Sequence, residues 1–124
     1  ISLLRKNKLP KETGGILIGT YDMERKKIFL SDTIIPTDNS EYPTFFYRGI
    51  GGLKNELERI RKTTSNMLTY VGEWHSHPKG CSILPSRDDM KLIAWLSNNM
   101  SVEGLPALML ILGDNNTFTI CFAE

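Results

Sequence analysis

Hydrophobic and polar residues alternate in blocks along the first third of the chain. Residues 15–21 and 27–35 are rich in β-branched and aliphatic side chains, and the polar residues 22–26 between them suit a hairpin connection. We therefore expect two antiparallel strands. An apolar stripe ahead of them predicts a short leading helix over residues 1–9, which ends before Pro10 because proline disfavours a helical residue in front of it.

The middle of the chain changes from a polar connection to an amphipathic pattern. Residues 36–52 are polar, contain Pro and Gly and carry a cluster of aromatic residues, which is typical of a long connection that can include a short strand. Connections of this length often carry function. Leucine and isoleucine then recur at helical spacing among Lys, Glu and Arg, so residues 53–62 are expected to form a helix with one face packed inward.

The second half of the chain repeats the alternation of strand and helix patterns. Residues 68–74 predict a strand that ends at a histidine-containing segment, and residues 86–98 predict a helix capped by a serine. Residues 107–112 and 117–122 flank the turn-forming residues 113–116 and predict a closing hairpin. The pattern as a whole predicts an α/β fold in which helices flank a mixed β-sheet.

Length and charge restrict the class of protein. A chain of 124 residues is long enough for one core and too short for two, so we expect a single domain over residues 1–124. The 15 Lys and Arg residues nearly balance the 14 Asp and Glu residues, which disfavours nucleic acid as a partner. No apolar run approaches the roughly 18 residues of a membrane span, and no signal peptide or CxxC pair is present. We therefore expect a cytoplasmic protein without a membrane partner.

Two histidines supply the first sign of chemistry. His75 and His77 are separated by one residue at the end of a predicted strand, so both rings project from the same side, about 7 Å apart at the backbone. Such a pair can close on one metal ion. Zinc binds imidazole nitrogens at about 2.0–2.1 Å, and a catalytic zinc site typically has three protein ligands and a water molecule. An HxH pair alone is weak evidence, and a third ligand is needed.

Further residues in a fixed order strengthen this interpretation. Glu12 lies in an E-x-x-G context with Gly15, the histidines belong to the segment His75-Ser76-His77-Pro78, and an S-x-x-D unit, Ser86 to Asp89, follows at a helix start. This set resembles the JAMM motif of the MPN (Mov34/JAB) metalloproteases, and the segment from Tyr70 to Pro78 resembles their prokaryotic branch. The resemblance implies an MPN-like fold and one Zn²⁺ per chain, bound by His75, His77 and Asp89.

The position of the aspartate departs from the usual spacing of that family. The usual spacing would place the serine and the aspartate at Pro85 and Asp88, whereas the intact S-x-x-D unit is displaced by one residue. At about 100° per residue, Asp89 shares its helix face with the inward apolar stripe that includes Ile93, and Asp88 aligns with polar Lys91. The helix pattern therefore favours Asp89 as the ligand.

The resemblance also implies roles and partners. Glu12 would act as general base and then as general acid, and Ser86 would donate a hydrogen bond to the oxyanion. The activity implied is a zinc-dependent isopeptidase or peptidase that cleaves the bond after the C-terminal tail of ubiquitin or a ubiquitin-like protein. Members of the prokaryotic branch often occur beside activating-like or conjugating-like enzymes. The connection 36–52 is expected to help form the channel for the tail.

Other functions remain open beside this one. MPN domains that have lost ligands serve as non-catalytic scaffolds, and the same site would serve a peptidase that acts on small peptides or a sulfur-carrier-like protein. An amidohydrolase is disfavoured because it needs a barrel of about 250 residues, and a metallo-β-lactamase-like enzyme because it needs more histidines. A deaminase-like zinc site would need an H-x-E and a C-x-x-C, so Cys81 is expected to be an ordinary loop thiol.

Each candidate residue also has a purely structural interpretation. Ser86 and Asp89 are typical of a capping box at a helix start, and Glu12 alone is typical of a solvated acid before a strand. The nearby glycines are typical of close strand packing. Trp74 and Trp95 are expected to be core or rim aromatics rather than platforms for a substrate.

Overall fold

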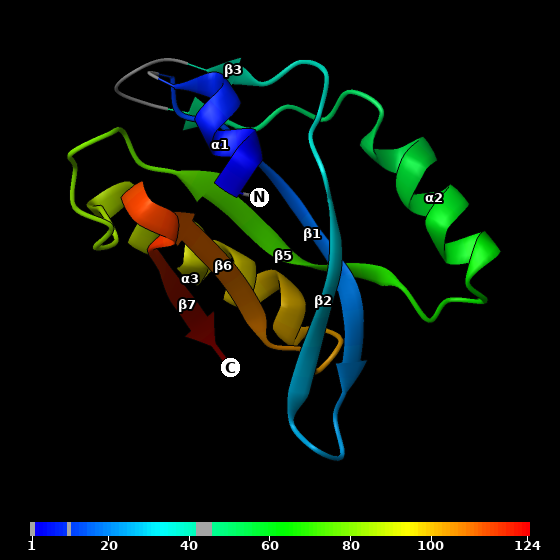
Figure 1. The fold of residues 1–124 in the computed structure, drawn as a ribbon. Coiled ribbons are helices and arrows are strands. Elements are labelled where there is room, and N and C mark those ends of the chain that lie inside the picture. Colours follow the sequence, from blue (N-terminus) through cyan, green and yellow to red (C-terminus); the bar gives the residue numbers. More distant parts are fainter. Residues whose placement is uncertain (1, 10, 42–45) are drawn as a thin grey trace.

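The computed structural model describes residues 2–9, 11–41 and 46–124 (Figure 1). The helices are α1 (Ser2–Lys8), α2 (Leu53–Thr63) and α3 (Arg87–Ser101), with a short 3₁₀ turn η1 (Asp114–Asn116). The strands are β1 (Gly14–Asp22), β2 (Lys27–Ile34), β3 (Ser40–Glu41), β4 (Phe46–Tyr47), β5 (Thr69–Ser76), β6 (Ala107–Leu112) and β7 (Phe118–Ala123). The predicted α/β fold with a mixed sheet and flanking helices is confirmed.

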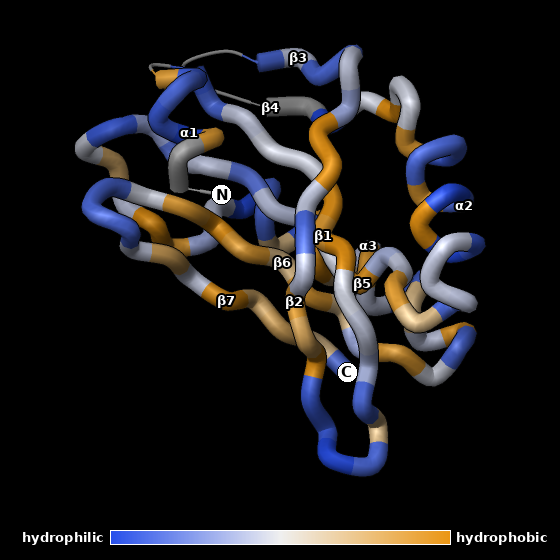
Figure 2. Tube along the Cα trace, turned by 45° about the vertical axis from the view of Figure 1, so that its right-hand side comes forward, coloured by the Kyte–Doolittle hydropathy of each residue, from blue (hydrophilic) through white to orange (hydrophobic). Residues whose placement is uncertain are grey.

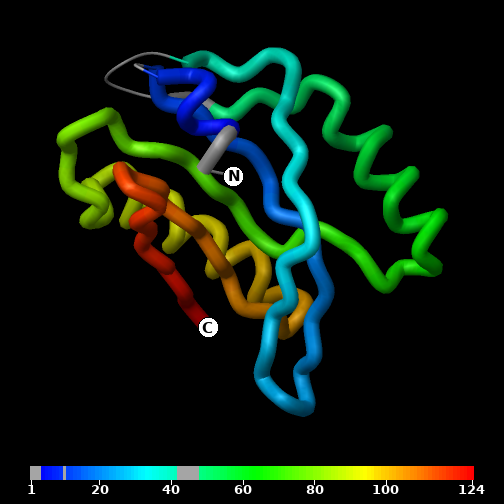
Figure 3. The backbone as a smooth tube through the Cα atoms, viewed as in Figure 1, coloured from blue at the N-terminus to red at the C-terminus, as the bar shows by residue number. Residues whose placement is uncertain are grey.

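The main sheet has five strands in the order β2-β1-β5-β6-β7. Neighbouring strands run antiparallel except β5 and β6, which are parallel and are joined by α3 as a crossover. Both predicted hairpins, β1 with β2 and β6 with β7, are present. β5 is thus the central strand, and its carboxyl end leads through a loop into α3, as Figure 3 shows at its left edge.

Hydrophobic segments follow the strands of this sheet, while α2 and the β1–β2 turn are largely hydrophilic (Figure 2). On one face, α3 packs on β6 through a cluster of Ile93, Leu96, Ala107, Met109 and Ile111, and α2 packs on β1 through Leu53. The other face holds a second cluster around Leu17, Trp74 and the even-numbered leucines of β6, against which Leu4 of α1 packs. α3 therefore places its first turn beside the end of β5.

The structure refines several predicted boundaries. β5 continues two residues past Trp74, through His75 and Ser76, because β6 pairs with it along its carboxyl end. The long connection contains two short strands, β3 and β4, rather than one. Pro10 and residues 42–45, which include part of the aromatic cluster of the connection 36–52, lie outside the described residues.

Gly15 allows close packing directly after the segment that carries Glu12. A Cβ atom built on Gly15 would lie 2.2 Å from the main-chain oxygen of Ile34 and 3.2 Å from Nε1 of Trp74. Any side chain here would therefore push β2 away from β1. The structural interpretation of this glycine as a close-packing residue is confirmed.

Among the described residues, no helix combines the length and the apolar character that crossing a lipid bilayer requires.

Candidate metal centre

The two histidines lie at the carboxyl end of the central strand. His75 pairs with Gly14 of β1 on one side and with Ile111 of β6 on the other, and its side chain is buried. His77 follows the last residue of β5 and is half-buried. Their ring centroids lie 5.3 Å apart, so the strand end presents both imidazoles to the same space, as the alternation of side chains along a strand predicts.

Asp89, in the first turn of α3, completes a three-residue cluster. Its Oδ1 lies 2.8 Å from Nε2 of His75, and its Oδ2 lies 3.0 Å from Nε2 of His77. Asp89 is buried with the two rings, whereas Asp88 is exposed on the rim of the same hollow. The structure therefore brings together the residues that the helix pattern favoured, with Asp89 rather than Asp88 facing the histidines.

The hydrogen bonds around the rings leave both Nε2 atoms facing the cluster. Nδ1 of His77 lies 2.7 Å from the main-chain oxygen of Ser82. A carbonyl can only accept, so this contact assigns a ring proton to Nδ1, and in the neutral ring it leaves a lone pair on Nε2, which lies 3.0 Å from Oδ2 of Asp89. Nε2 of His75 is buried without a hydrogen bond among the described residues, because its direction misses Asp89 although the distance is only 2.8 Å.

This donor set fits a zinc ion. A buried ring nitrogen without a partner is costly, and a metal ion at the centre of the cluster would satisfy it. The three ligand atoms lie within 4.8 Å of one another, and two imidazoles with one carboxylate leave a coordination position for water. Cys81 is an exposed free thiol outside this cluster, in agreement with its expected role as a loop residue.

Protonation of the ligands follows from their surroundings. Burial alone would raise the pKa of Asp89, but His75, His77 and the Ser86 N–H together hold this pKa far below its ordinary value. In the doubly protonated ring, Nε2 of His77 donates to Asp89, and this hydrogen bond raises the pKa of His77 while burial opposes the rise. The aspartate is therefore a carboxylate throughout the physiological range, which is the form that binds a cation.

Glu12 lies opposite the histidines just before β1. The Thr13 N–H donates to Oγ of Ser76 at 3.0 Å, and the Ser76 N–H donates to the Thr13 carbonyl at 2.8 Å. This pairing continues the β1–β5 register, in which Gly14 faces His75, and so places Glu12 across from His77. Glu12 is only 7% exposed, and burial raises its pKa, with the two histidines opposing that rise. It is not the solvated acid that its local sequence alone suggests.

Ser86 caps α3 and lies on the rim of the same hollow. Its Oγ accepts a hydrogen bond from the Asp89 N–H at 3.1 Å, and Oδ2 of Asp89 accepts from the Ser86 N–H at 2.8 Å. The capping box named in the structural interpretation is therefore real. It leaves the hydroxyl hydrogen of Ser86 free to donate, because accepting the Asp89 N–H uses only a lone pair.

The cluster opens into a hollow of about 680 Å³ between the end of β5 and α3. Leu92 and the 58% exposed Trp95 form the α3 wall, so Trp95 is a rim aromatic as expected, whereas Trp74 is buried in the core. The hollow has a second polar group in its lining, two residues before His75 on β5. There, Glu73 accepts hydrogen bonds from Nε of Arg48 at 2.5 Å and from the Tyr70 hydroxyl at 2.6 Å.

The sequence interpretation missed the Arg48–Glu73 pair. Glu73 is buried on the same face of β5 as His75, and burial raises its pKa although Tyr70 and Arg48 oppose that rise. The signal in the sequence that could have identified Glu73 is its position, two residues before the candidate ligand His75 in the same predicted strand. Arg48 belongs to the connection 36–52, so that connection does contribute a side chain to the hollow.

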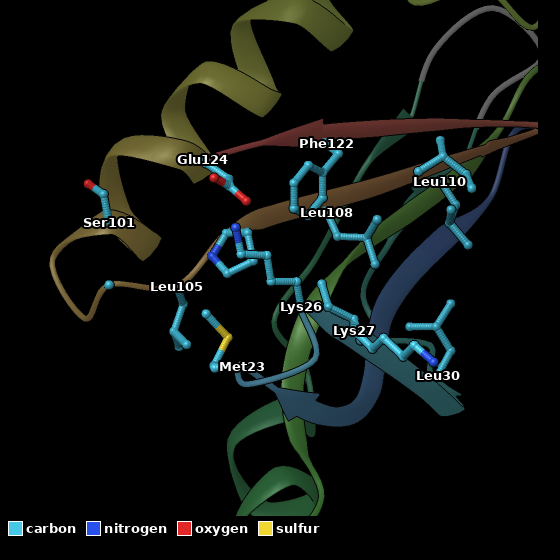
Figure 4. A pocket seen from close by; sticks show the side chains of 14 residues that line it. Met23, Lys26, Lys27, Leu30, Ser101, Leu105, Leu108, Leu110, Phe122 and Glu124 are labelled. Atoms are coloured by element: carbon cyan, nitrogen blue, oxygen red, sulfur yellow. The ribbon is translucent and has the colours of Figure 1, made fainter.

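A second hollow, of about 560 Å³, lies on the sheet face away from α3 (Figure 4). Leu108, Leu110 and Phe122 of β6 and β7 face side chains of β2 and the β1–β2 turn across it. Its charged groups, Lys26, Lys27 and Glu124, lie among apolar side chains, and it contains no cluster of metal-binding residues among those described. The chemistry of the molecule therefore concentrates at the end of β5.

Comparison with known proteins agrees with the geometry. The family described as prokaryotic homologs of the JAB domain matches residues 1–122. A protein of Enterobacter hormaechei subsp. hoffmannii (strain UCI 50), named CD-NTase/cGAS isopeptidase, is 41% identical over 103 residues, which cover 82% of this chain. The matched region covers 55% of that relative, so the chain spans about half its length. With the family matching nearly end to end, the chain belongs to the prokaryotic branch of the JAB-domain family.

Proposed function

We propose that this chain is a zinc-dependent isopeptidase that hydrolyses the bond between the C-terminal tail of a ubiquitin-like protein and an amine. The observation that carries this proposal is the buried cluster of His75, His77 and Asp89, with Glu12 facing it across the β1–β5 pairing. Family membership and the name of the Enterobacter relative support the reaction class.

Zinc bound to the cluster would supply a Lewis acid that lowers the pKa of a water molecule and polarises the substrate carbonyl. His75 and His77 would hold it through their Nε2 atoms, and Asp89 through its carboxylate. The Ser82 carbonyl keeps the proton of His77 on Nδ1, as outer partners of metal-binding histidines commonly do.

Glu12 would transfer the proton. Its buried carboxylate can accept the proton of the attacking water and then deliver it to the departing amine, and burial raises its pKa toward the range that suits both steps. The leaving group would be the ε-amino group of a lysine or an α-amino group.

Ser86 would stabilise the charge that develops on the substrate oxygen. Its hydroxyl hydrogen is not used by the capping box, and the residue lies on the rim of the same hollow as Glu12 and the histidines. A donor held by a helix start is preorganised, which is what makes an oxyanion-hole hydrogen bond effective.

The hollow would bind the substrate on either side of the scissile bond. Trp95 and Leu92 offer an apolar wall along α3, and Arg48 of the Arg48–Glu73 pair offers hydrogen-bond donors in the same hollow. An extended tail could bind here through its main chain, with small terminal residues next to the cluster. By analogy with the relative's name, conjugates of a CD-NTase or cGAS-like protein are the first substrates to consider.

The test is a cleavage assay on isopeptide-linked conjugates. The zinc-loaded protein is incubated with a CD-NTase-like protein, and separately with a ubiquitin-like protein, each joined through its C-terminus to a lysine ε-amine, and the products are mapped by mass spectrometry. We expect cleavage after the C-terminal residue of the tail by the parent chain and cleavage slower by about 10²–10⁴-fold by Glu12→Gln. Intact conjugates of both kinds with zinc bound to the protein would favour a non-catalytic scaffold.

A further inference from the structure

A buried arginine lies behind the candidate metal centre, on the short helix α1. Arg5 is 6% exposed, and its guanidinium donates to the main-chain oxygen of His77 from Nε at 3.3 Å and from Nη2 at 3.0 Å. Nη2 also donates to Oδ1 of Asp114, in η1, at 2.9 Å. No feature of the leading helix in the sequence distinguishes Arg5 from the exposed basic residues near it, and its partners are 72 and 109 residues away.

The two histidines differ in how their main chains are held. His75 is paired on both sides, with β1 and with β6. His77 lies beyond the end of β5, and among the described residues its one main-chain hydrogen bond to the sheet is on the β6 side, where its N–H donates to the Leu112 carbonyl at 2.8 Å. Its own carbonyl accepts from Arg5. Arg5 thus holds the His77 carbonyl where β5 itself has ended.

Asp114 extends this contact into the loop that follows. Its Oδ2 accepts from the Gly80 N–H at 2.7 Å, while its Oδ1 accepts from Arg5. Two points of the loop, His77 and Gly80, are therefore held through one Arg5–Asp114 pair. The same loop carries the Ser82 carbonyl, which fixes the ring orientation of His77.

An arginine suits this position better than a lysine. Burying a charge is costly unless it is paired and hydrogen-bonded, and Arg5 meets that cost with a carboxylate and a carbonyl. The planar guanidinium presents several donors in a rigid fork, so it can hold both acceptors at once. A lysine ammonium is a point charge on a flexible stem and would hold them with less defined geometry.

We propose that Arg5 is a positioning residue of the metal centre, which fixes the main chain of His77 through its carbonyl and, through Asp114, the loop that orients the His77 ring. This inference rests on the proposed zinc site and concerns a residue that touches neither metal nor substrate. Outer partners of metal ligands typically change metal affinity by about 10–100-fold when removed. We expect an effect of that size from Arg5.

The experiment measures zinc affinity by competition with a chelator and records the visible spectrum of the cobalt-substituted protein, which reports ligand geometry. The variants are Arg5→Met, Arg5→Lys and Asp114→Ala. Arg59→Met is the control, because Arg59 forms an exposed ion pair with Glu56 on α2. We expect zinc affinity to fall about 10–100-fold for Arg5→Met and less for the other two. We also expect an altered cobalt spectrum for Arg5→Met and no change for the control.

A purely structural role for Arg5 predicts a different result. In that case Arg5→Met would lower the melting temperature of the metal-free protein. Folded Arg5→Met and Asp114→Ala would nevertheless keep the zinc affinity and the cobalt spectrum of the parent. That result would overturn the inference and leave the zinc site intact. If Arg5→Met does not fold, Asp114→Ala decides alone, because Asp114 lies at the surface side of the pair. A folded parent that binds no zinc would remove the proposed function and this inference together.

Discussion

The two hollows of this molecule have similar volumes, about 680 and 560 Å³, yet their linings differ in kind. The hollow at the end of β5 contains buried acids and histidines, whereas the hollow on the opposite face of the sheet is lined mainly by aliphatic and aromatic side chains (Figure 4). Size alone therefore does not identify the reactive site. The burial of polar groups identifies it, because burying a polar or charged group is costly unless a hydrogen bond or an opposite charge replaces its lost hydration.

The distribution of buried polar residues makes the same point across the described parts of the chain. Those residues are Arg5, Glu12, Thr13, Glu73, His75, Ser76 and Asp89, and every one lies on β5, on the segment paired with its end, or in contact with its end. The apolar clusters elsewhere contribute stability through burial of hydrocarbon. The polar region instead resembles a functional site that the rest of the fold must stabilise.

The largest expected effect separates the two adjacent acids at the polar hollow. The zinc affinity of Asp89→Ala should fall by more than about 100-fold because a ligand is lost. Removing an outer partner of a ligand typically lowers metal affinity by only about 10–100-fold. Asp88→Ala should bind zinc like the parent, since Asp88 is exposed and faces the rim. Chelator competition measures both. Asp89→Asn keeps an acceptor for the helix cap and shows whether loss of zinc follows from the charge rather than from the fold.

The opposite pattern, with metal lost in Asp88→Ala and kept in Asp89→Ala, would transfer the ligand role to Asp88 and withdraw the oxyanion role from Ser86.

The next largest effect concerns proton transfer. Glu12→Gln should keep zinc and the fold while turnover of the isopeptide substrate falls about 10²–10⁴-fold, because an amide cannot accept and return a proton. Glu58→Gln, on the exposed face of α2, is the matched control. Single-turnover kinetics with zinc content measured on the same samples give the comparison. Equal turnover in Glu12→Gln and the control would exclude Glu12 from the mechanism.

A smaller effect is expected at the helix cap. Ser86→Ala should lower turnover about 10²-fold by removing an oxyanion donor. It should also cost about 1 kcal/mol in the free energy of unfolding, since the capping acceptor is lost. Ser86→Thr keeps both the hydroxyl and the cap and should stay near the parent. If thermal stability falls in Ser86→Ala while turnover does not, the residue serves the helix alone.

The smallest effect belongs to the apolar side of the sheet. Tyr21 packs against the cluster around Leu17, and its buried hydroxyl has no hydrogen-bond partner among the described residues. Burial raises the pKa of Tyr21 to about 12. Tyr21→Phe should therefore change the free energy of unfolding near neutral pH by less than about 1 kcal/mol and leave turnover unchanged.

The pH dependence of that variant has a definite sign. Because the folded pKa of Tyr21 lies above the ordinary value of 10, ionisation favours the unfolded chain, and its contribution to stability is lost as the pH rises from 10 toward 12. Phenylalanine cannot ionise, so Tyr21→Phe keeps its stability in this range. It should therefore be the more stable of the two proteins above pH 10 in denaturant titrations. If the free energies of unfolding of the two proteins changed with pH in the same way, burial would not be raising the pKa of Tyr21, and this prediction would be wrong.

Local patterns in the sequence predict most of the elements, and the resemblance to the JAMM motif singles out much of the polar site. Periodicity placed both hairpins and the helices, and the position of Asp89 on the apolar stripe of α3 distinguished it from Asp88. The predicted strand stops short of the histidines because the last residues of β5 are polar, and it is their pairing with β1 and β6 that extends the strand.

Contacts between distant residues could not be predicted in the same way. Arg5 and His77 are 72 residues apart, and Arg48, in the connection 36–52, binds Glu73 of β5 25 residues later. Each of these residues is a basic side chain in a polar local context, which ordinarily indicates an exposed surface. Only the tertiary arrangement brings their partners within reach, so their burial or pairing has no local signature.

The most direct test of the account is a zinc titration of the metal-free protein, with hydrolysis of an isopeptide-linked conjugate as the readout. Because His75, His77 and Asp89 form the one cluster of metal-binding residues found in the described parts of the chain, activity should be absent after chelation. It should return in proportion to added zinc and saturate at about one zinc ion per chain. Undiminished hydrolysis by the fully metal-depleted protein would contradict the account.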